Sequence, residues 1–294
     1  MERSDFRPAL PAGGPEKVIP VIIKNLLLIA LAVGMLYPII WMFFSSFQEN
    51  DEIFNVAAVF PKRWMFENYA DGWKSIPGHT FGEFFRNSLL VSLTIVLGTL
   101  ISASLTAYPF ARLRFRGRAI LFTLIIATLL LPGQILLIPR YILFVRFGWG
   151  DSYYPLTVPA FFAQVSGAFS IYLLIQFMKG IPKELDEAAL VDGCGYFRQF
   201  AEIILPNCKP ALFTIGIFSF IWSWDDFLNQ LIYINSISKF TVALALRMFT
   251  DNTAMTPWGQ MFAMSILSIL PCTIIFASAQ KYFVEGIVTT GLKG

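Results

Sequence analysis

Residues able to carry out covalent or hydrolytic chemistry are sparse in this chain of 294 residues, and their spacing fits no catalytic motif. The single histidine, His79, rules out a His-Glu-x-x-His zinc site, and no Gly-Lys pair exists to form a phosphate-binding loop. Cys194, Cys208 and Cys272 lack Cys-x-x-Cys spacing, so no metal site is expected. The sequence therefore predicts a protein that is not an enzyme and that itself binds no cofactor or metal. Any uphill process would need energy from another chain.

A second group of residues could bind a solute without reacting with it. Two adjacent carboxylates interrupt an apolar run, and aromatic and amide side chains lie close to them in sequence. Aromatic ring faces beside hydrogen-bonding groups suit sugars, which present both apolar faces and hydroxyls. In the alternative interpretation the aromatic residues form a membrane-interface belt, while the acids pair with a neighbouring helix or cap a helix break. The group consists of Trp222, Asp225, Asp226, Asn229 and Tyr233.

The segment 184–206, ELDEAALVDGCGYFRQFAEIILP, is a polar interruption between apolar runs. Pro182 suits the first position of a short helix, and Gly193 suits the position just after its end. Acidic residues favour the positive end of the helix dipole, and three lie in the first turns, namely Glu184, Asp186 and Glu187.

A second helical piece, YFRQFAEIIL, is expected before Pro206. At helical spacing its apolar residues form a packing stripe, made of Phe197, Phe200, Ile203 and Ile204. Ala188 and Ala189 are small enough to let another surface approach closely. On residue types alone, the segment is either an ordinary amphipathic connector or a docking element.

Composition identifies the surroundings of these groups. The chain is 56% hydrophobic and 14% charged, with thirty phenylalanines and a mean hydropathy of +0.64. About a quarter of residues are charged in soluble proteins, and roughly 20 apolar residues cross a bilayer as one helix. We therefore expect an all-α integral membrane protein with six transmembrane helices, near 25–44, 87–108, 119–138, 155–178, 210–233 and 258–280.

Basic residues predict the orientation. The loop ARLRFRGR (111–118) contains four arginines and no acid, as is typical of cytoplasmic loops. This places both termini and the loop 179–209, between the fourth and fifth spans, in the cytoplasm. The expected organisation is a cytoplasmic tail over 1–20 followed by a transmembrane domain over 21–294. The net charge of +3 follows from this bias, and no basic patch indicates nucleic-acid binding.

The polar segment resembles the EAA loop of ABC-importer permeases, in which a coupling helix docks on a separate cytoplasmic ATPase. The resemblance is carried by the spacing between Glu187-Ala188-Ala189, Gly193 and the sequence around Pro206. It implies that these residues couple the chain to an ATPase, and the matching positions are Glu187, Ala188, Ala189, Gly193, Ile203, Leu205 and Pro206.

Two further stretches resemble the carbohydrate-uptake, maltose-type branch of that family. The first is NCKPALFTIGIFSFIWSWDDFL (207–228), in which Asp225 stands where asparagine is common. The second is the ending KYFVEGIVTTGLKG. In that branch such a tail inserts between the two ATPase subunits, which implies partner contacts by Gly291, Lys293 and Gly294.

The resemblance implies a permease subunit of a type I ABC importer for a carbohydrate, such as an oligosaccharide, in a bacterial inner membrane. Its expected partners are a second homologous permease, two ATPase subunits that bind ATP and Mg, an external solute-binding protein and membrane lipid. The alternatives are a type I permease for a non-sugar solute and a secondary transporter. Secondary transporters often contain inverted repeats, and no convincing repeat is present.

Overall fold

The structure is a computed structural model that describes residues 15–55, 60–163, 167–250 and 256–291. Within those residues every regular element is helical and no strand occurs. The longer helices are α1 (Pro15–Ser45), α3 (Phe81–Arg112), α4 (Arg118–Leu130), α5 (Leu137–Arg146), α7 (Gly167–Gly180), α8 (Glu184–Val191), α11 (Lys209–Trp224) and α14 (Trp258–Gly291). The shorter ones are α2 (Glu67–Trp73), η1 (Gly133–Leu136), α6 (Tyr154–Thr157), η2 (Val158–Phe162), α9 (Tyr196–Arg198), η3 (Gln199–Ile204), α10 (Leu205–Asn207), α12 (Leu228–Tyr233), η4 (Ile237–Lys239) and α13 (Val242–Met248).

Four segments are long and apolar enough to cross a bilayer singly: Ile22–Ser45, Phe81–Arg112, Tyr154–Gly180 and Trp258–Ser278. Two helix pairs pass the same test only together, and each is sharply bent at a short break. The pairs are Arg118–Leu130 with Gly133–Arg146, bent by 96°, and Tyr196–Asn207 with Lys209–Trp224, bent by 77°. The all-helical prediction is thus confirmed, whereas six spans are obtained only if each bent pair counts as one.

The third predicted span is irregular, as its prolines indicate. Helix α4 ends at Leu130, and Leu131 is extended, with φ −85° and ψ 119°. The ring of Pro132 disfavours a helical conformation at the residue before it, so the helix stops there. The chain then continues through η1 into α5 in a new direction.

The fifth predicted span, 210–233, is not one continuous helix, and the interpretation in which an acid caps a helix break agrees with the structure. Helix α11 ends at Trp224, and a separate short helix, α12, follows. The Asp226 carboxylate accepts the backbone N–H of Asn229 at 3.2 Å and its side-chain amide at 3.0 and 3.1 Å. The amide of Gln230 donates to the Ser223 carbonyl at 3.1 Å. These side chains satisfy backbone groups that a continuous helix would have paired, because Asp and Asn compete locally with helical hydrogen bonds.

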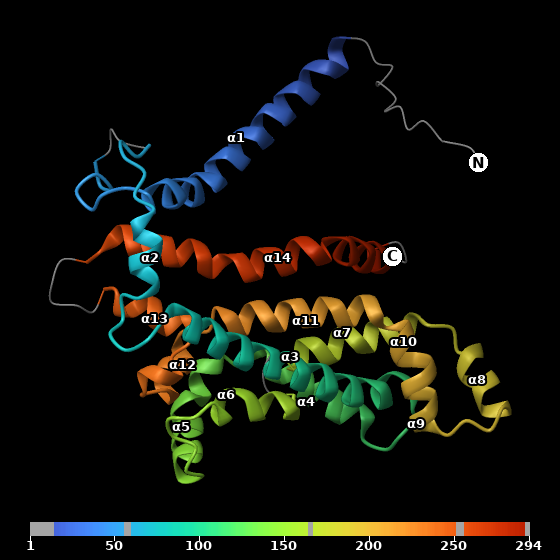
Figure 1. The fold of residues 1–294 in the computed structure, drawn as a ribbon. Coiled ribbons are helices and arrows are strands. Elements are labelled where there is room, and N and C mark those ends of the chain that lie inside the picture. The colour runs from blue at the N-terminus through green and yellow to red at the C-terminus, as the bar shows by residue number, and fades with distance from the viewer. Residues whose placement is uncertain (1–14, 56–59, 164–166, 251–255, 292–294) are drawn as a thin grey trace.

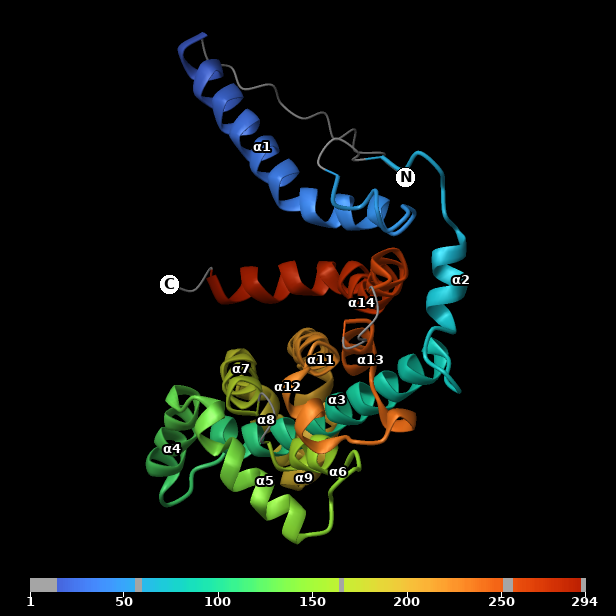
Figure 2. The same ribbon diagram turned by 90° about the vertical axis from the view of Figure 1, so that its left-hand side faces the viewer.

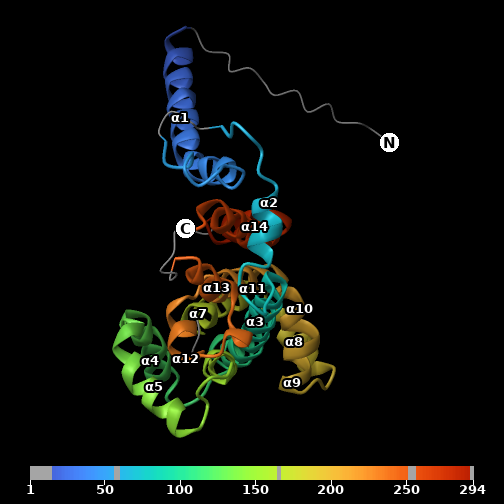
Figure 3. The same ribbon diagram turned by 60° about the vertical axis from the view of Figure 1, so that its left-hand side comes forward.

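Helix α3 runs through the middle of the bundle (Figures 1 and 2) and packs against α7, α11, α13 and η2. Its closest approach to η2 is at Gly98, where an added Cβ would lie 2.8 Å from the ring of Phe161. Side chains from α3, α7, η3 and α11 share one buried cluster, which includes Ala107, Leu174 and Ile204. By contrast, α1 lies apart from the bundle, with α14 as its main neighbour (Figures 2 and 3). A displacement of α3 would therefore change the packing of most other helices in the bundle.

The two ends of the molecule carry different elements. Helices α8, α9 and α10 lie at one end, together with the beginning of α1 and the end of α14 (Figure 1). Helices α2, α12 and α13 lie at the opposite end, as does α5.

A hydrogen-bonded clamp centred on Asp151 joins two loops at the α12 end. Its carboxylate accepts the backbone N–H groups of Asn235 and Ser236, both at 2.9 Å, and the Ser236 hydroxyl at 2.6 Å. The Lys239 ammonium lies 2.8 Å from the same carboxylate. Hydrogen bonds hold the pKa of Asp151 well below its ordinary value, and the bond from Lys239 has a larger effect than either bond from Ser236. The clamp thus fastens the loop before α6 to the loop before α13.

We expect Asp151→Asn to lower the thermal unfolding midpoint by about 1–3 °C at pH 7, as for one partly exposed ion pair. Asparagine tolerates the positive φ of 48° at this position, so the variant removes the charge and one acceptor oxygen without straining the backbone. Because the folded-state pKa is lowered, the stabilisation is complete above the unfolded pKa of about 3.9 and declines as the pH falls further. Thermal unfolding scans between pH 3 and 7 should show that the difference in midpoint between the wild type and the variant narrows only below about pH 4. A difference that instead grows toward acid would contradict the clamp.

Candidate functional site

Helix α8 ends in a Schellman motif, as Gly193 predicts. Gly193 has φ 75°, and its N–H donates to the Leu190 carbonyl at 3.1 Å. The N–H of Cys194 donates to the Ala189 carbonyl at 2.9 Å. A left-handed residue at this position lets both bonds form. The predicted start is off by two residues, because Lys183 precedes the first helical residue and Pro182 lies one residue before it.

The two alanines of α8 face in different directions. Ala189 is 4% exposed and lies against the chain itself, whereas Ala188 and Glu187 are exposed. The last residues of the helix, Leu190 and Val191, are 54% and 88% exposed. The outer face of α8 is therefore an acidic and apolar knob that no described part of this chain covers.

The second helical piece is mostly a π-helix, η3, rather than a regular α-helix. Phe200 and Ile204 are buried, Ile203 is half-buried and Phe197 is 75% exposed. The predicted stripe is therefore wrong at Phe197, because it assumed α-helical periodicity and a π-turn contains more residues.

The end of this piece also departs from the prediction. Pro206 does not stop a helix but lies in the first turn of α10, and the bend falls at Cys208, next to α11. Leu205 is half-buried and Pro206 is exposed.

The residue that fixes α8 is Arg112, which the sequence interpretation counted only as a cytoplasmic charge. One guanidinium nitrogen lies 3.1 Å from a carboxylate oxygen of Asp186, and another donates to the Ile181 carbonyl at 3.0 Å. The Arg112 side chain is 4% exposed and that of Asp186 is 19% exposed. The last residue of α3 is thus bonded to α8 and to the segment leading into it. The only available signal was its position at the end of a long apolar span, because its partner on α8 is distant in sequence.

The structure does not bring the five predicted solute-binding residues into one site. Trp222 is 45% exposed, and its ring stacks on Phe218 with centroids 5.3 Å apart. It also meets Phe169 of α7 edge-on at 5.8 Å. Asp225 lies elsewhere, beside a cavity of about 230 Å³ between α11, α13 and α14 that Cys272 also lines.

The other three members are engaged within the chain to different degrees. Asp226 and Asn229 are bonded to each other, and both are half-buried. Tyr233 is 3% exposed, because Phe144 and Tyr141 pack beside it with centroids 5.8 and 6.1 Å away. Its position is that of a packing residue. Trp222 and Asp225 are the two exposed members of the group.

The predicted tail contacts are only partly within the described residues. Helix α14 extends to Gly291, whereas Lys293 and Gly294 lie outside them.

Comparison with known proteins gives the family. A family model described as "Binding-protein-dependent transport system inner membrane component" matches residues 95–288. The chain belongs to this family. It is a permease subunit of an ABC importer and resides in a bacterial inner membrane.

Named relatives and a solved structure agree with that assignment. The trehalose/maltose transport system permease protein MalG of Thermococcus litoralis is 30% identical over 95% of this chain and 99% of its own length. The sn-glycerol-3-phosphate transport system permease protein UgpE of Brucella abortus is 30% identical over 94% of this chain and 98% of its own. A chain from a bacterial ABC transporter involved in alginate import superposes with a TM-score of 0.82 at 22% identity. That superposition covers 93% of this permease and 100% of the other chain, which shows the shared fold.

We expect Arg112→Ala to loosen α8 without disturbing the bundle. Hydrogen bonds to a charged group contribute about 1.5–3 kcal/mol, so amide exchange over residues 184–191 should accelerate roughly 10- to 100-fold. Exchange in the buried part of α3 should stay unchanged, as measured by hydrogen–deuterium exchange mass spectrometry of the purified permease.

The matched control is Arg116→Ala, which removes an exposed arginine from the same loop. Equal exchange rates in the Arg112 and Arg116 variants would show that the ion pair does not hold α8.

Proposed function

We propose that the chain is one of two permease subunits of a type I importer for a carbohydrate, such as an oligosaccharide or related glycoside. The other components are a second homologous permease, two cytoplasmic ATPase subunits and an external solute-binding protein. The trehalose/maltose relative supports a sugar, and the glycerol-3-phosphate relative keeps a phosphorylated polyol as the second candidate. ATP and Mg bind to the partner ATPases, and this chain supplies none of that chemistry.

The observation that carries the proposal is the uncovered outer face of α8. It presents Glu187, Ala188, Leu190 and Val191 at the tip of the molecule (Figure 1). Apolar side chains in such numbers favour burial against a partner. A cleft on each ATPase subunit would cover this knob, and Gly291, Lys293 and Gly294 would add contacts from the C-terminal tail. Ile203, Leu205 and Pro206 would support the knob from behind.

The arrangement also supports the proposed topology of six spans with both termini in the cytoplasm. The beginning of α1, the end of α14 and helix α8 lie at one end of the molecule (Figure 1). Each bent helix pair then counts as one span, and the first span, which begins at Ile22, follows the proposed cytoplasmic tail over 1–20. The Asp151 clamp lies on the external side.

The proposed mechanism transmits motion through one ion pair. Closing of the ATPases on ATP moves α8, and the bond between Asp186 and Arg112 passes that movement to α3. Because α3 packs against α7, α11 and α13, the bundle alternates between inward and outward access. ATP hydrolysis resets the cycle. On the pathway, Trp222 supplies a ring face for the sugar, and Asp225, Asp226 and Asn229 supply polar groups.

The proposal is tested by reconstituting all components in vesicles and measuring ATP-dependent uptake. A labelled panel should include trehalose, maltose and sn-glycerol 3-phosphate. We expect a sugar to accumulate inside only when ATPases, both permeases and the binding protein are present. Accumulation by this chain alone would establish a secondary transporter. Uptake restricted to sn-glycerol 3-phosphate would replace the sugar assignment.

Coupling is tested at Gly193, where an added Cβ meets no atom within 4 Å and the only strain is conformational. A β-branched residue tolerates positive φ poorly, whereas asparagine tolerates it. We expect Gly193→Val to reduce solute-stimulated ATP hydrolysis about five- to thirtyfold, from 1–2 kcal/mol of backbone strain. Gly193→Asn should retain most of it. Equal solute-stimulated ATP hydrolysis in both variants would show that the turn at Gly193 is not needed for coupling.

A further inference from the structure

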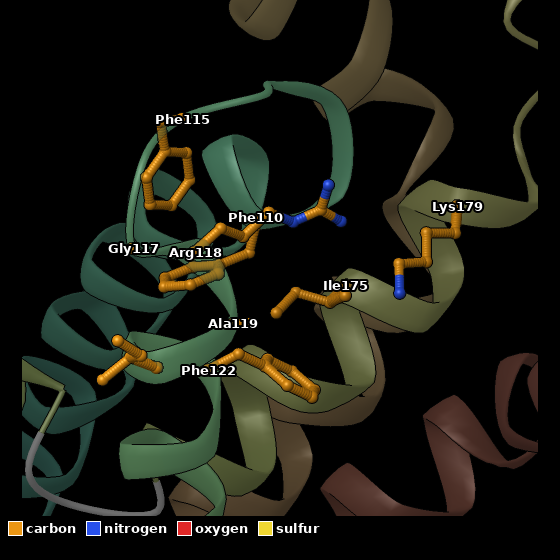
Figure 4. A pocket seen from close by; sticks show the side chains of 9 residues that line it. Phe110, Phe115, Gly117, Arg118, Ala119, Phe122, Ile175 and Lys179 are labelled. Carbon is orange, nitrogen blue, oxygen red and sulfur yellow. The ribbon is translucent and has the colours of Figure 1, made fainter.

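An open pocket of about 530 Å³ lies at the α8 end of the bundle, where α3 ends and α4 begins. Figure 4 shows its shape: Phe110, Phe122 and Ile175 form an apolar floor, and Arg118 and Lys179 reach over it from α4 and α7. The proposed coupling surface of α8 does not contribute to it.

The polar part of the pocket is cationic throughout. Arg118 makes one long contact, 3.5 Å, to the Leu113 carbonyl, and Lys179 is exposed with no ion pair or hydrogen bond to any described residue. No acidic side chain is among the residues that line the pocket. The start of α4 adds the same sign of charge, because its N-cap, Gly117, has no side chain to pair with the first amides. The site therefore favours an anion.

The apolar side chains of the pocket indicate that the bound anion belongs to a molecule that also has an apolar part. Phe110 and Ile175 are buried, Phe122 is half-buried, and Ile120 at the rim is 68% exposed. A free phosphate would leave this surface uncovered, whereas a second protein segment would need an acidic side chain matched to the two cations. A phospholipid carries both a phosphate and acyl chains.

The position of the pocket agrees with such a ligand. Arg118 opens α4 and Lys179 lies in the last turn of α7, so both mark ends of membrane-embedded helices on the side of the arginine-rich loop. Basic pockets between transmembrane helices at the cytoplasmic face are suited to anionic headgroups. This reasoning uses the membrane placement of the family and does not depend on the transported solute.

We propose that this pocket binds one anionic phospholipid of the inner leaflet. Arg118 and Lys179 hold its phosphate, and the first acyl carbons lie over Phe110, Phe122 and Ile175. The lipid would fasten the beginning of α4 to the end of α7, beside the segment that leads into α8.

The test uses the assembled importer in detergent, titrated with phosphatidylglycerol and followed by native mass spectrometry. The double variant Arg118→Gln/Lys179→Gln should bind the lipid roughly 25-fold more weakly, at about fivefold for each lost cation. The matched control is Arg116→Gln/Lys183→Gln, which removes two exposed cations from the same end but outside the pocket. It should bind as tightly as the wild type.

A phosphatidylglycerol carrying a diazirine on its acyl chain locates the site. It should label peptides that contain Phe122 or Ile175, and excess phosphatidylglycerol should block the labelling more than phosphatidylcholine or inorganic phosphate does. Equal blocking by inorganic phosphate would overturn the proposal, as would labelling confined to other helices. Disulfide crosslinking of an Ala119→Cys variant to the second permease would assign the pocket to a subunit interface instead. None of these outcomes depends on whether the importer carries sugar.

Discussion

The ion pair between Arg112 and Asp186 is the interaction on which the α8 end of this permease depends. A guanidinium that is 4% exposed cannot lose its carboxylate without leaving a buried charge unpaired. The pair is not fully satisfied, since Arg112 Nε and Asp186 Oδ1 are buried without hydrogen-bond partners among the described residues. An imperfect buried pair contributes little net stability but defines geometry. Here it sets where α8 lies relative to the most embedded helix of the bundle.

Large parts of the surface are apolar and exposed in the isolated chain, so other molecules must cover them. None of the thirteen residues of α4 is buried, and along α1 exposed apolar side chains include Met35 at 72%. Such surfaces are unfavourable in water and are suited to lipid or to a second permease. The chain is therefore only part of a working unit. Its internal packing, centred on α3, provides a stiff body, while α1, α4 and the outer face of α8 provide surfaces for other molecules.

Residue types predicted the features that depend on local rules. The turn at Gly193 needs a left-handed residue, and the break before Pro132 follows from the proline ring, so both could be located from sequence. Hydropathy does not predict the end of α11 at Trp224, whereas the interpretation in which an acid caps a helix break agrees with Asp226, whose carboxylate accepts the N–H of Asn229. The burial of Tyr233 and Arg112 was also missed, since it results from contacts with α5 and α8, which are distant in sequence.

The same distinction separates the two parts of the candidate site. The proposed coupling segment is contiguous, so its spacing could be compared with a family, and its first helix and the turn at Gly193 were predictable. The predicted solute-binding group was chosen by residue type from positions that are close together in sequence. Once the chain breaks after Trp224, Trp222 turns toward α7 while Asp225 turns toward α14. Closeness in sequence does not bring side chains into one site when the helix that carries them breaks.

The central claim is that α8 and α3 move as one body. Spin labels at Leu185 on α8 and Leu105 on α3 would report this motion in the assembled importer with its native cysteines replaced. These residues are 41% and 49% exposed, and Leu185 is not part of the proposed docking face. The account predicts one narrow distance distribution by double electron–electron resonance, unchanged between the nucleotide-free and ATP-bound states. It also predicts that the distribution broadens when Arg112 is replaced by alanine. A distance that shifts on ATP binding in the otherwise wild-type permease would show that α8 moves independently, and would contradict the account.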